Sequence, residues 1–496
     1  MTAPPSRPPL PVGTRLVLDR SVRHLAGGTV LTGGHPGRLV RLTGAGRLAL
    51  AELLDGSATT EGSRRLGRRL VEVGMAHPLL RAATDTDLGR VTAVVPVRDR
   101  SSLLNQVLEC LVGIRTVVVD DGSVDPEAIA EVCRRYGATL LRRPVSGGPA
   151  AARNDGLARV DTELAALVDS DCRPSPGWLA GLVGAFDDPE VAAVAPRVRP
   201  VTAGRTVLAR YLDGRSPLDL GTEAGPVGPD RRVRYVPTAA LVVRRAALAG
   251  GAAFDPDLRF GEDVDLVWRL VENGWVVRYE PSVEVGHAEP TTWSATLARR
   301  FRYGTSAGPL ARRHPGTLTP VELRPVPTAA ALSLLAGHPV PAAVITAVSG
   351  ARLARRVQPL GVPASTAVGW SLQGTGWTVV GLGRAATVLV APAVATALLV
   401  GGRTRPRQRL RRAAVALLAV PAVVEWWQRR PDLDPLRWTV ASVVDDVAYG
   451  VGVWAGSLAA RTTGPLLPVF RENRSDEPPS GGPGADDPLA EPPGGV

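Results

Sequence analysis

Apolar and polar positions alternate in a regular order through the middle of the chain. Four short apolar runs predict buried strands: residues 91–97, 116–120, 138–143 and 163–171. The first of them, VTAVVPV, is continuous, as in a parallel strand that is covered on both faces. Between the runs, apolar residues recur at helical spacing, for example Ile129, Val132 and Cys133. This βαβαβ order predicts an α/β fold with a doubly wound sheet whose ligands bind at the carboxyl ends of the strands.

Polar residues predict where two of these helices begin. Ser101 precedes an apolar stripe that includes Leu104 and Leu108, and we expect it to cap that helix. Asp125 and Pro126 are residue types that commonly begin a helix, and we expect Pro126 to lie in its first turn.

The first part of the chain, residues 11–85, has a different pattern. Residues 15–25 and 27–42 predict a pair of strands, and Thr43 is expected to cap a helix over Ala45–Leu54. A second helix, Gly62–Val73, is amphipathic. No catalytic cluster occurs here, so the residues alone leave open a recognition domain and a packing or dimerisation domain.

Long uncharged runs separated by arginine clusters fill residues 325–465. The runs are residues 325–351, 357–383, 385–402 and 413–424. A helix that spans a membrane needs about 20 apolar residues. Basic flanks favour the cytoplasmic face and anionic lipid. We expect this region to associate with a membrane, and the alternative is a buried all-helical domain.

The charge of the chain supports this interpretation of the C-terminal region. All 58 basic residues are Arg, and they exceed the acidic residues to give a formal net charge of +11. Residues 324–474 contain 17 Arg and six acidic residues. Because the excess is local and lies beside apolar runs, we expect an anionic membrane surface as the partner and no nucleic acid.

Two features of the composition remain, which are the three scattered cysteines and the residue types at the two ends of the chain. Cys110, Cys133 and Cys172 lack the spacing of a zinc site or a disulfide framework, which favours a reducing compartment. No secretory signal is recognised near the start. Residues 1–10 and 474–496 are rich in Pro, Gly or acidic residues and are expected to be disordered.

Acidic residues follow the predicted strands. Asp121 lies at a strand end, where it can accept hydrogen bonds from a nucleoside or form an Asx turn. Asp169 and Asp171 follow another strand, and alternate residues in extended chain project alike. They can face one divalent cation, which would neutralise a leaving diphosphate, or they can be solvated loop residues.

Three further features can belong to the same site. The sequence SGGPAAARNDG contains Gly148 in a flexible turn and Arg153, which can contact phosphate. Glu262 and Asp263 begin a predicted helix, either as residues favoured by the helix dipole or, for Asp263, as a general base. His287 is either structural or a further metal ligand.

The order of these motifs resembles a known family. PVRDR, DDGS, SGGPAAARN, DSD, GED and GH occur over residues 91–305 as they do in inverting family 2 nucleotide-sugar glycosyltransferases with the GT-A fold. The resemblance implies nucleotide-sugar binding by Pro96, Val97, Asp99, Asp121, Gly148, Arg153, Asp169 and Ser170. It implies a metal site for Mg²⁺ or Mn²⁺ at Asp171 and His287, and an acceptor and donor pocket at Pro237, Thr238 and Ala239. It makes Asp263 the base, with Glu262 beside it in the catalytic ED motif. No QxxRW motif is present, which argues against processive synthesis.

The whole layout is similar to the mycofactocin-system glycosyltransferases of actinobacteria. That resemblance implies a PqqD-like, winged-helix peptide-recognition module at 11–85, a GT-A domain at 90–306 and a hydrophobic helical region at 325–465. It also implies transfer of β-1,4-linked glucose from UDP-glucose to a peptide-derived mycofactocin precursor, at the cell membrane with the catalytic domain in the cytoplasm. Two alternatives remain: a glycosyltransferase for cell-envelope polysaccharide or lipid, and a non-catalytic peptide-binding scaffold.

Overall fold

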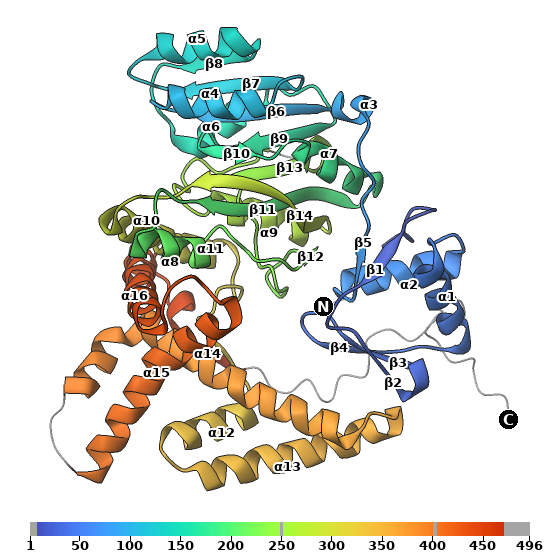
Figure 1. Ribbon diagram of the computed structural model, residues 1–496, viewed down its shortest axis with the longest axis vertical. Coiled ribbons are helices and arrows are strands. Elements are labelled where there is room, and N and C mark those ends of the chain that lie inside the picture. The colour runs from blue at the N-terminus through green and yellow to red at the C-terminus, as the bar shows by residue number, and fades with distance from the viewer. Residues whose placement is uncertain (1–6, 249–250, 400–403, 471–496) are drawn as a thin grey trace. The chain divides into compact units, whose positions relative to one another are not determined.

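The computed structural model describes residues 7–248, 251–399 and 404–470 (Figure 1). The chain divides into two compact units. The described part of the first consists of residues 7–201 and 216–289, and that of the second consists of residues 202–215 and 290–470.

The N-terminal module of the first unit has its own hydrophobic core. Its elements are β1 (Leu16–Leu18), β2 (Arg23–Leu25), β3 (Val30–Gly33), β4 (Arg38–Arg41), α1 (Gly44–Asp55), α2 (Glu61–Glu72) and β5 (Ala76–Pro78). Strands β2, β3 and β4 form one antiparallel sheet, and β1 pairs with β5. Thr43 accepts a hydrogen bond from the Gly46 backbone, which confirms the predicted cap. Leu10 is buried in this core, so the ordered module begins before residue 11.

A nine-stranded mixed sheet follows in the same unit. Strands β6 (Val91–Val97), β7 (Arg115–Asp121), β8 (Thr139–Arg143) and β9 (Leu164–Val168) are parallel, as the sequence predicts. The sheet continues through β13 (Ala240–Arg244), β11 (Val191–Val201), β14 (Val276–Ala288) and β10 (Cys172–Pro174), with β12 (Gly225–Pro226) beside β14. Strand β13 runs antiparallel to both neighbours, whereas β14 is parallel to β11. The predicted α/β class is therefore confirmed, with an antiparallel insertion.

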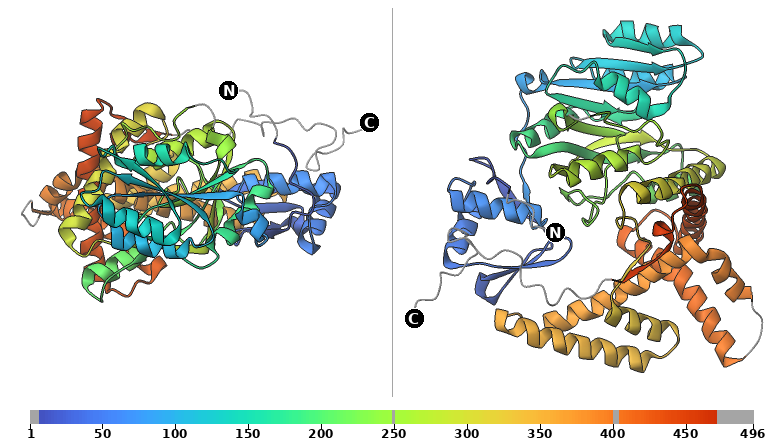
Figure 2. Two further views of the ribbon diagram at one scale, coloured as in Figure 1. Left: turned by 90° about the horizontal axis from the view of Figure 1, so that it is seen from above. Right: turned by 180° about the vertical axis from the view of Figure 1, so that it is seen from behind.

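Helices cover both faces of this sheet (Figure 2). Helices α4 (Ser101–Cys110), α5 (Pro126–Tyr136) and α7 (Trp178–Val183) contribute buried side chains to one large core that includes β6. Helix α6 (Gly148–Leu157) packs on the opposite face against β6 and β7. A Cβ on Gly156 would lie 2.4 Å from Val94 Cγ1, so only glycine permits this close approach of α6 to the sheet.

The two predicted helix starts had different outcomes. Asp125 accepts a hydrogen bond from the Ala128 backbone and Pro126 occupies the first turn of α5, as predicted. The prediction for Ser101 was wrong, because Arg100 is the N-cap residue of α4 and no side chain caps this helix. The loop turns two residues before Ser101, where Asp99 has a φ of 56°, so Ser101 is already helical.

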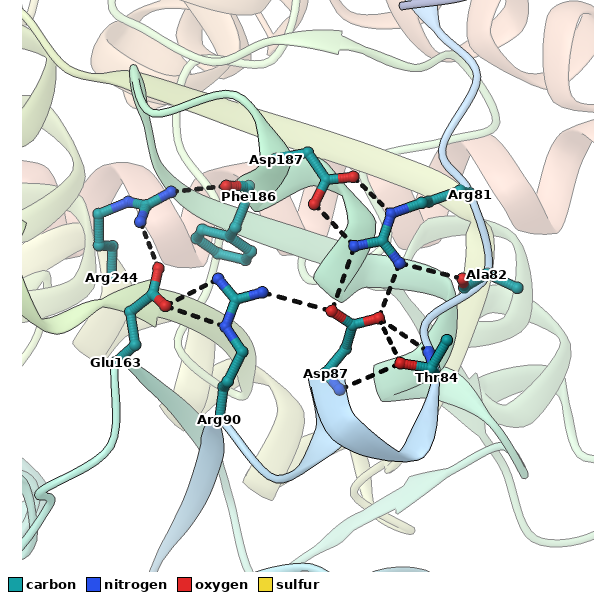
Figure 3. Close-up of polar contacts among 9 residues, drawn as sticks. All are labelled: Arg81, Ala82, Thr84, Asp87, Arg90, Glu163, Phe186, Asp187 and Arg244. Carbon is teal, nitrogen blue, oxygen red and sulfur yellow. Dashed lines mark hydrogen bonds and ion pairs between the residues drawn. The ribbon is translucent and has the colours of Figure 1, made fainter. Parts of the chain in front are cut away.

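A network of charged side chains attaches the linker after β5 to the sheet domain (Figure 3). Arg81 contacts Asp187 at 2.6 Å and Asp87 at 2.7 Å. Asp87 belongs to the short helix α3 (Asp85–Leu88), where it forms a capping box with Thr84.

Figure 3 also shows how the network continues into the sheet domain. Arg90 pairs with Glu163 at 2.7 Å, and Arg244 contacts the same carboxylate at 2.5 Å. Arg90 and Glu163 directly precede β6 and β9, so the linker is fixed at the amino ends of the parallel strands. The linker therefore does not cover the carboxyl ends of these strands, where ligands are expected to bind.

The second unit is mainly helical. Its elements are α8 (Val207–Arg215), α10 (Trp293–Thr305), α11 (Ala307–Arg313), β15 (Glu322–Leu323), α12 (Pro325–Leu335), α13 (Pro339–Val357), α14 (Ala364–Leu399), α15 (Arg405–Arg429), α16 (Pro435–Ala459) and β16 (Val469–Phe470). Tyr211 and Trp438 are buried in its core. Arg215 pairs with Asp445 and Asp446, each at 2.8 Å. Helix α10 packs along α16, so the C-terminal segment of this unit begins at Pro290 and includes residues that the sequence assigned to the domain ending at 306.

Among the described helices, α14 is the one that is long and apolar enough to cross a membrane. It contains 36 residues, and its most apolar 18-residue window has a mean hydropathy of 1.7. Pro392 lies inside the helix, and the backbone is non-helical at Val390. The expected disorder of residues 1–6 and 474–496 concerns positions outside the described residues.

Candidate active site

The turn after β9 brings two predicted metal-site residues together. The Asp169 backbone N–H donates to the Ala239 carbonyl, and the Cys172 N–H donates to the Asp169 carbonyl, which closes the turn around Ser170. Strand β10 then pairs with β14 so that Cys172 lies opposite His287. As a result, His287 Nε2 lies 3.6 Å from Asp171 Oδ1.

Arg153 connects the Asp169 turn to the ED motif. From α6, its guanidinium donates to Asp169 at 2.6 Å and to Glu262 at 2.8 Å. The side chain is almost completely buried. Burial disfavours the charge, but the two carboxylates outweigh it and hold the pKa of Arg153 above its ordinary value. Arg153 therefore stays a fixed cation between two acidic motifs that are far apart in sequence.

Glu262 and Asp263 lie in the first turn of α9 (Glu262–Glu272). Gly261 precedes them with a φ of 83°, a left-handed conformation that favours glycine and turns the chain into the helix. No side chain caps this helix. Asp263 accepts a hydrogen bond from the adjacent Val264 N–H at 2.8 Å, so its carboxylate also satisfies a backbone donor of the first helical turn, where the helix dipole favours acidic residues.

The surroundings of Asp263 change its acidity. Burial, followed by the neighbouring Glu262 charge, raises the pKa of Asp263 to about 7. The Val264 N–H and the Arg153 charge act in the opposite direction. A carboxyl group with this pKa exchanges protons near neutral pH, which suits a general acid or base.

The carboxylate of Asp121 organises the glycine-rich loop before α6. It accepts hydrogen bonds from Ser146 Oγ at 2.7 Å and from the Gly147 and Gly148 backbone N–H groups, each at 2.9 Å. In the neighbouring loop, Asp99 accepts from the Val124 N–H at 2.6 Å. Both aspartates thus shape loops at the carboxyl ends of the strands, and their contact with a nucleoside stays a prediction.

The remaining predicted residues lie on elements that reach the same edge of the sheet. Pro96 and Val97 end β6, and Val97 is buried. Thr238 and Ala239 are buried, and the Ala239 carbonyl accepts from the Asp169 N–H at 3.0 Å and from Cys172 Sγ at 3.1 Å. The Pro237–Ala239 segment therefore lies beside the Asp169 turn.

Sequence reasoning missed the contacts that Phe254 and Arg100 make at this site. Asn154 holds the Phe254 backbone with two hydrogen bonds, and the Arg153 guanidinium lies 5.6 Å from the centre of the Phe254 ring. Arg100 contacts Asp171 at 2.5 Å. The RN pair in SGGPAAARN was a usable signal for Asn154, whereas Phe254 lies 100 residues away in sequence and carries no motif.

Asp171 and His287 fit a divalent cation through the chemistry of their donor atoms. A carboxylate oxygen beside an imidazole nitrogen is a suitable donor pair for Mn²⁺, and the carboxylate also suits Mg²⁺. Within the described residues, no group of three or more His, Cys, Asp and Glu side chains is arranged to hold a metal.

The chain is similar to known glycosyltransferases. Residues 92–248 match the Glycosyl transferase family 2. The pre-mycofactocin glycosyltransferase of Mycobacterium tuberculosis is 38% identical over 480 residues, which cover 93% of this chain and 99% of that protein. The probable glycosyltransferase YdaM of Bacillus subtilis is 23% identical and covers 44% of this chain and 55% of its own length. The solved mannosyltransferase PcManGT of Pyrobaculum calidifontis, in complex with GDP-Man and Mn²⁺, has 19% identity and a TM-score of 0.41, and covers 74% of this chain and 87% of its own.

The protein is an enzyme, a glycosyltransferase of family 2 with the GT-A fold that the motifs predict. Because the similarity to the mycobacterial protein extends over nearly the whole of both chains, the chain belongs to the pre-mycofactocin glycosyltransferase family. The family resemblance found in the sequence is thereby confirmed.

Proposed function

We propose that this protein transfers a hexose, glucose from UDP-glucose, to a peptide-derived mycofactocin precursor with inversion at the anomeric carbon. The observation that carries the proposal is the Arg153 bridge, which holds Asp169 and Glu262 in one cluster beside Asp263. A single in-line displacement needs a base on one face of the sugar and a stabilised leaving group on the other. The cluster has residues suited to both tasks.

Asp263 acts as the base in this proposal. In its ionised form it accepts the proton of the acceptor hydroxyl while the oxygen attacks the anomeric carbon, and the bond to the nucleoside diphosphate breaks. The Arg153 charge offsets part of the negative charge of Glu262 and Asp169 and lowers the pKa of Asp263, which favours ionisation of Asp263 near pH 7. The product would carry a β linkage if the donor is α-linked.

Asp171 and His287 are the side chains that would hold Mg²⁺ or Mn²⁺. When bound, the cation would neutralise negative charge on the leaving diphosphate. The Asp121-ordered loop, with backbone N–H groups at the start of α6, lies at the strand ends where the nucleotide is expected.

The N-terminal module is proposed to select the peptide-derived acceptor. Its separate core supports a distinct recognition role. It is joined to the sheet domain by a two-pronged ion pair between Arg68 and Asp188, with N–O distances of 2.7 and 2.9 Å. Arg68 is buried, and such bidentate pairs fix orientation as well as distance.

The helical unit is proposed to associate with the cytoplasmic leaflet of the cell membrane. Support comes from the apolar helix α14 and from large exposed apolar side chains on the neighbouring helices, such as Val344 and Trp427. Exposed arginines at the start of α15, including Arg407 and Arg409, would meet anionic lipid. Flotation of the purified protein with vesicles tests this, and equal recovery with and without anionic lipid would contradict it.

A direct transfer assay tests the function. Purified full-length protein is incubated with UDP-glucose, Mn²⁺ and the peptide-derived precursor, and products are identified by mass and by the anomeric coupling in NMR. We expect added hexose in β linkage. Transfer only to a lipid or polysaccharide acceptor would favour an envelope enzyme, and no turnover of any nucleotide sugar would overturn the proposal.

A further inference from the structure

A buried carboxylate faces the imidazole of His287 from the side away from Asp171. Glu289 Oε1 lies 4.0 Å from His287 Nδ1, while His287 Nε2 lies 3.6 Å from Asp171 Oδ1. The ring therefore has a carboxylate near each nitrogen. His287 Nδ1 is buried and makes no hydrogen bond within the described residues.

Backbone pairing fixes this arrangement. The Ala288 N–H donates to the Asp171 carbonyl, and the Glu289 N–H donates to the Val201 carbonyl at the end of β11. Because alternate residues of an extended strand project to the same side, His287 and Glu289 are presented together. The Glu289 side chain is only 1% exposed.

Ser216 holds the Glu289 carboxylate in place. Its hydroxyl donates to Glu289 Oε1 at 2.6 Å, and both residues are buried. The groups thus follow one another in the order Ser216, Glu289, His287 and Asp171, all within the first unit. Of these, only Asp171 and His287 are implied by the glycosyltransferase motifs.

A histidine that binds a metal through Nε2 carries its hydrogen on Nδ1, and that buried N–H needs an acceptor. A shift of about 1 Å would bring the Glu289 oxygen within hydrogen-bonding distance of Nδ1. Carboxylates that accept this second N–H typically improve metal affinity about 10- to 100-fold by fixing the tautomer and the ring orientation.

We propose that Glu289 is a positioning residue of this enzyme, which accepts the Nδ1 hydrogen of His287 and so directs Nε2 toward Asp171 and the divalent cation. The inference rests on the proposed metal role of His287. In this role Glu289 acts through His287 and touches neither substrate nor metal.

Mn²⁺ binding to the full-length protein in the presence of UDP, followed by electron paramagnetic resonance, tests the proposal. We expect Glu289→Leu to weaken Mn²⁺ affinity about tenfold or more. Glu289→Gln retains an acceptor oxygen, so it should weaken Mn²⁺ affinity less than Glu289→Leu does. The double variant with His287→Ala should bind Mn²⁺ no more weakly than His287→Ala alone, because both changes affect one ligand.

Asp19 offers a matched control in the N-terminal module. It is also a buried carboxylate that contacts a serine, Ser21, and a histidine, His77. We expect Asp19→Asn to leave Mn²⁺ affinity within about twofold of the wild type, even if it lowers the melting temperature. This comparison separates a specific effect of Glu289 from a general loss of stability.

The outcomes distinguish a failure of the Glu289 role from a failure of the proposed metal site. If His287→Ala weakens Mn²⁺ binding but Glu289→Leu stays within about twofold of the wild type, or if the two effects multiply in the double variant, the positioning role of Glu289 is overturned. If His287→Ala itself leaves Mn²⁺ affinity unchanged, the proposed metal site is wrong and the Glu289 proposal fails with it.

Discussion

Arg153 and Glu262 are 109 positions apart in sequence, and their side chains meet at 2.8 Å. The same guanidinium contacts Asp169 at 2.6 Å. Three motifs that are separate in the chain are thus joined by one buried cation, and the proposed chemistry depends on that cation.

Replacement of Arg153 tests this dependence. Arg153→Met leaves the carboxylates of Glu262 and Asp169 without their cation, and the Arg153 charge normally lowers the pKa of Asp263. We expect kcat/KM to fall at least about 100-fold at pH 7 and the acidic limb of the pH profile to move to higher pH. Arg159→Met, at an exposed arginine just beyond the same helix, is the control. An unchanged pH profile in the Arg153→Met variant would remove Arg153 from this role.

The pH dependence of the wild type follows from the pKa of Asp263, which is about 7. A base must be ionised to accept a proton, so activity is lost as pH falls through that value. We expect kcat/KM to drop about tenfold for each pH unit below 7 and to level off above it. Initial rates from pH 5 to 9 at constant ionic strength test this, and a flat profile between pH 5.5 and 8 would contradict it.

The ionised form of Asp263 should also lower the free energy of unfolding at high pH. Its folded pKa of about 7 lies above its ordinary value of 3.8, so the folded chain binds more protons and loses stability as pH rises through this window. Removing the charge with Asp263→Asn should therefore stabilise the protein by up to about 4 kcal/mol at pH 8 and by less at pH 5.

Thermal or urea unfolding of the Asp263→Asn variant at the two pH values measures the difference. Asp161→Asn serves as a control, because the Asp161 side chain is 80% exposed. If Asp263→Asn gains no more stability at pH 8 than at pH 5, the raised pKa of Asp263 is wrong.

Asp171 should affect donor binding through the metal. We expect Asp171→Ala to raise the Kd for UDP-glucose at least about tenfold in Mn²⁺ and to leave binding in EDTA unchanged, because the variant lacks a cation ligand. Isothermal titration calorimetry in the two buffers makes the comparison, with Asp161→Ala as the control. Equal donor affinity of the wild type and the Asp171→Ala variant in Mn²⁺ would refute the assignment.

Local sequence signals predicted the elements that they directly encode. Thr43, Asp125 and Pro126 start helices as expected, and the parallel strands from β6 to β9 lie within the apolar runs. The fourth run was predicted too long, because β9 ends at Val168 and residues 169–171 form a turn instead of extended chain. These features depend on neighbouring residues, so a single sequence contains the information for them.

Features set by distant contacts were not predictable in this way. The pairing of β10 with β14 places Cys172 opposite His287, and nothing local marks that register. The predicted cap at Ser101 was wrong because the loop turns at Asp99 and the N-cap residue is Arg100, one position earlier. The hydrogen bonds of Asp121 to the glycine-rich loop and the approach of Glu289 to His287 likewise follow from the packing of elements far apart in sequence.

The proposed role of Asp263 as the catalytic base is tested by the Asp263→Asn variant. Single-turnover transfer from UDP-glucose and the Kd for UDP-glucose are measured with the same full-length preparation in Mn²⁺. We expect the transfer rate to fall about 100- to 10,000-fold while donor affinity stays within about threefold of the wild type. A transfer rate close to that of the wild type would contradict it.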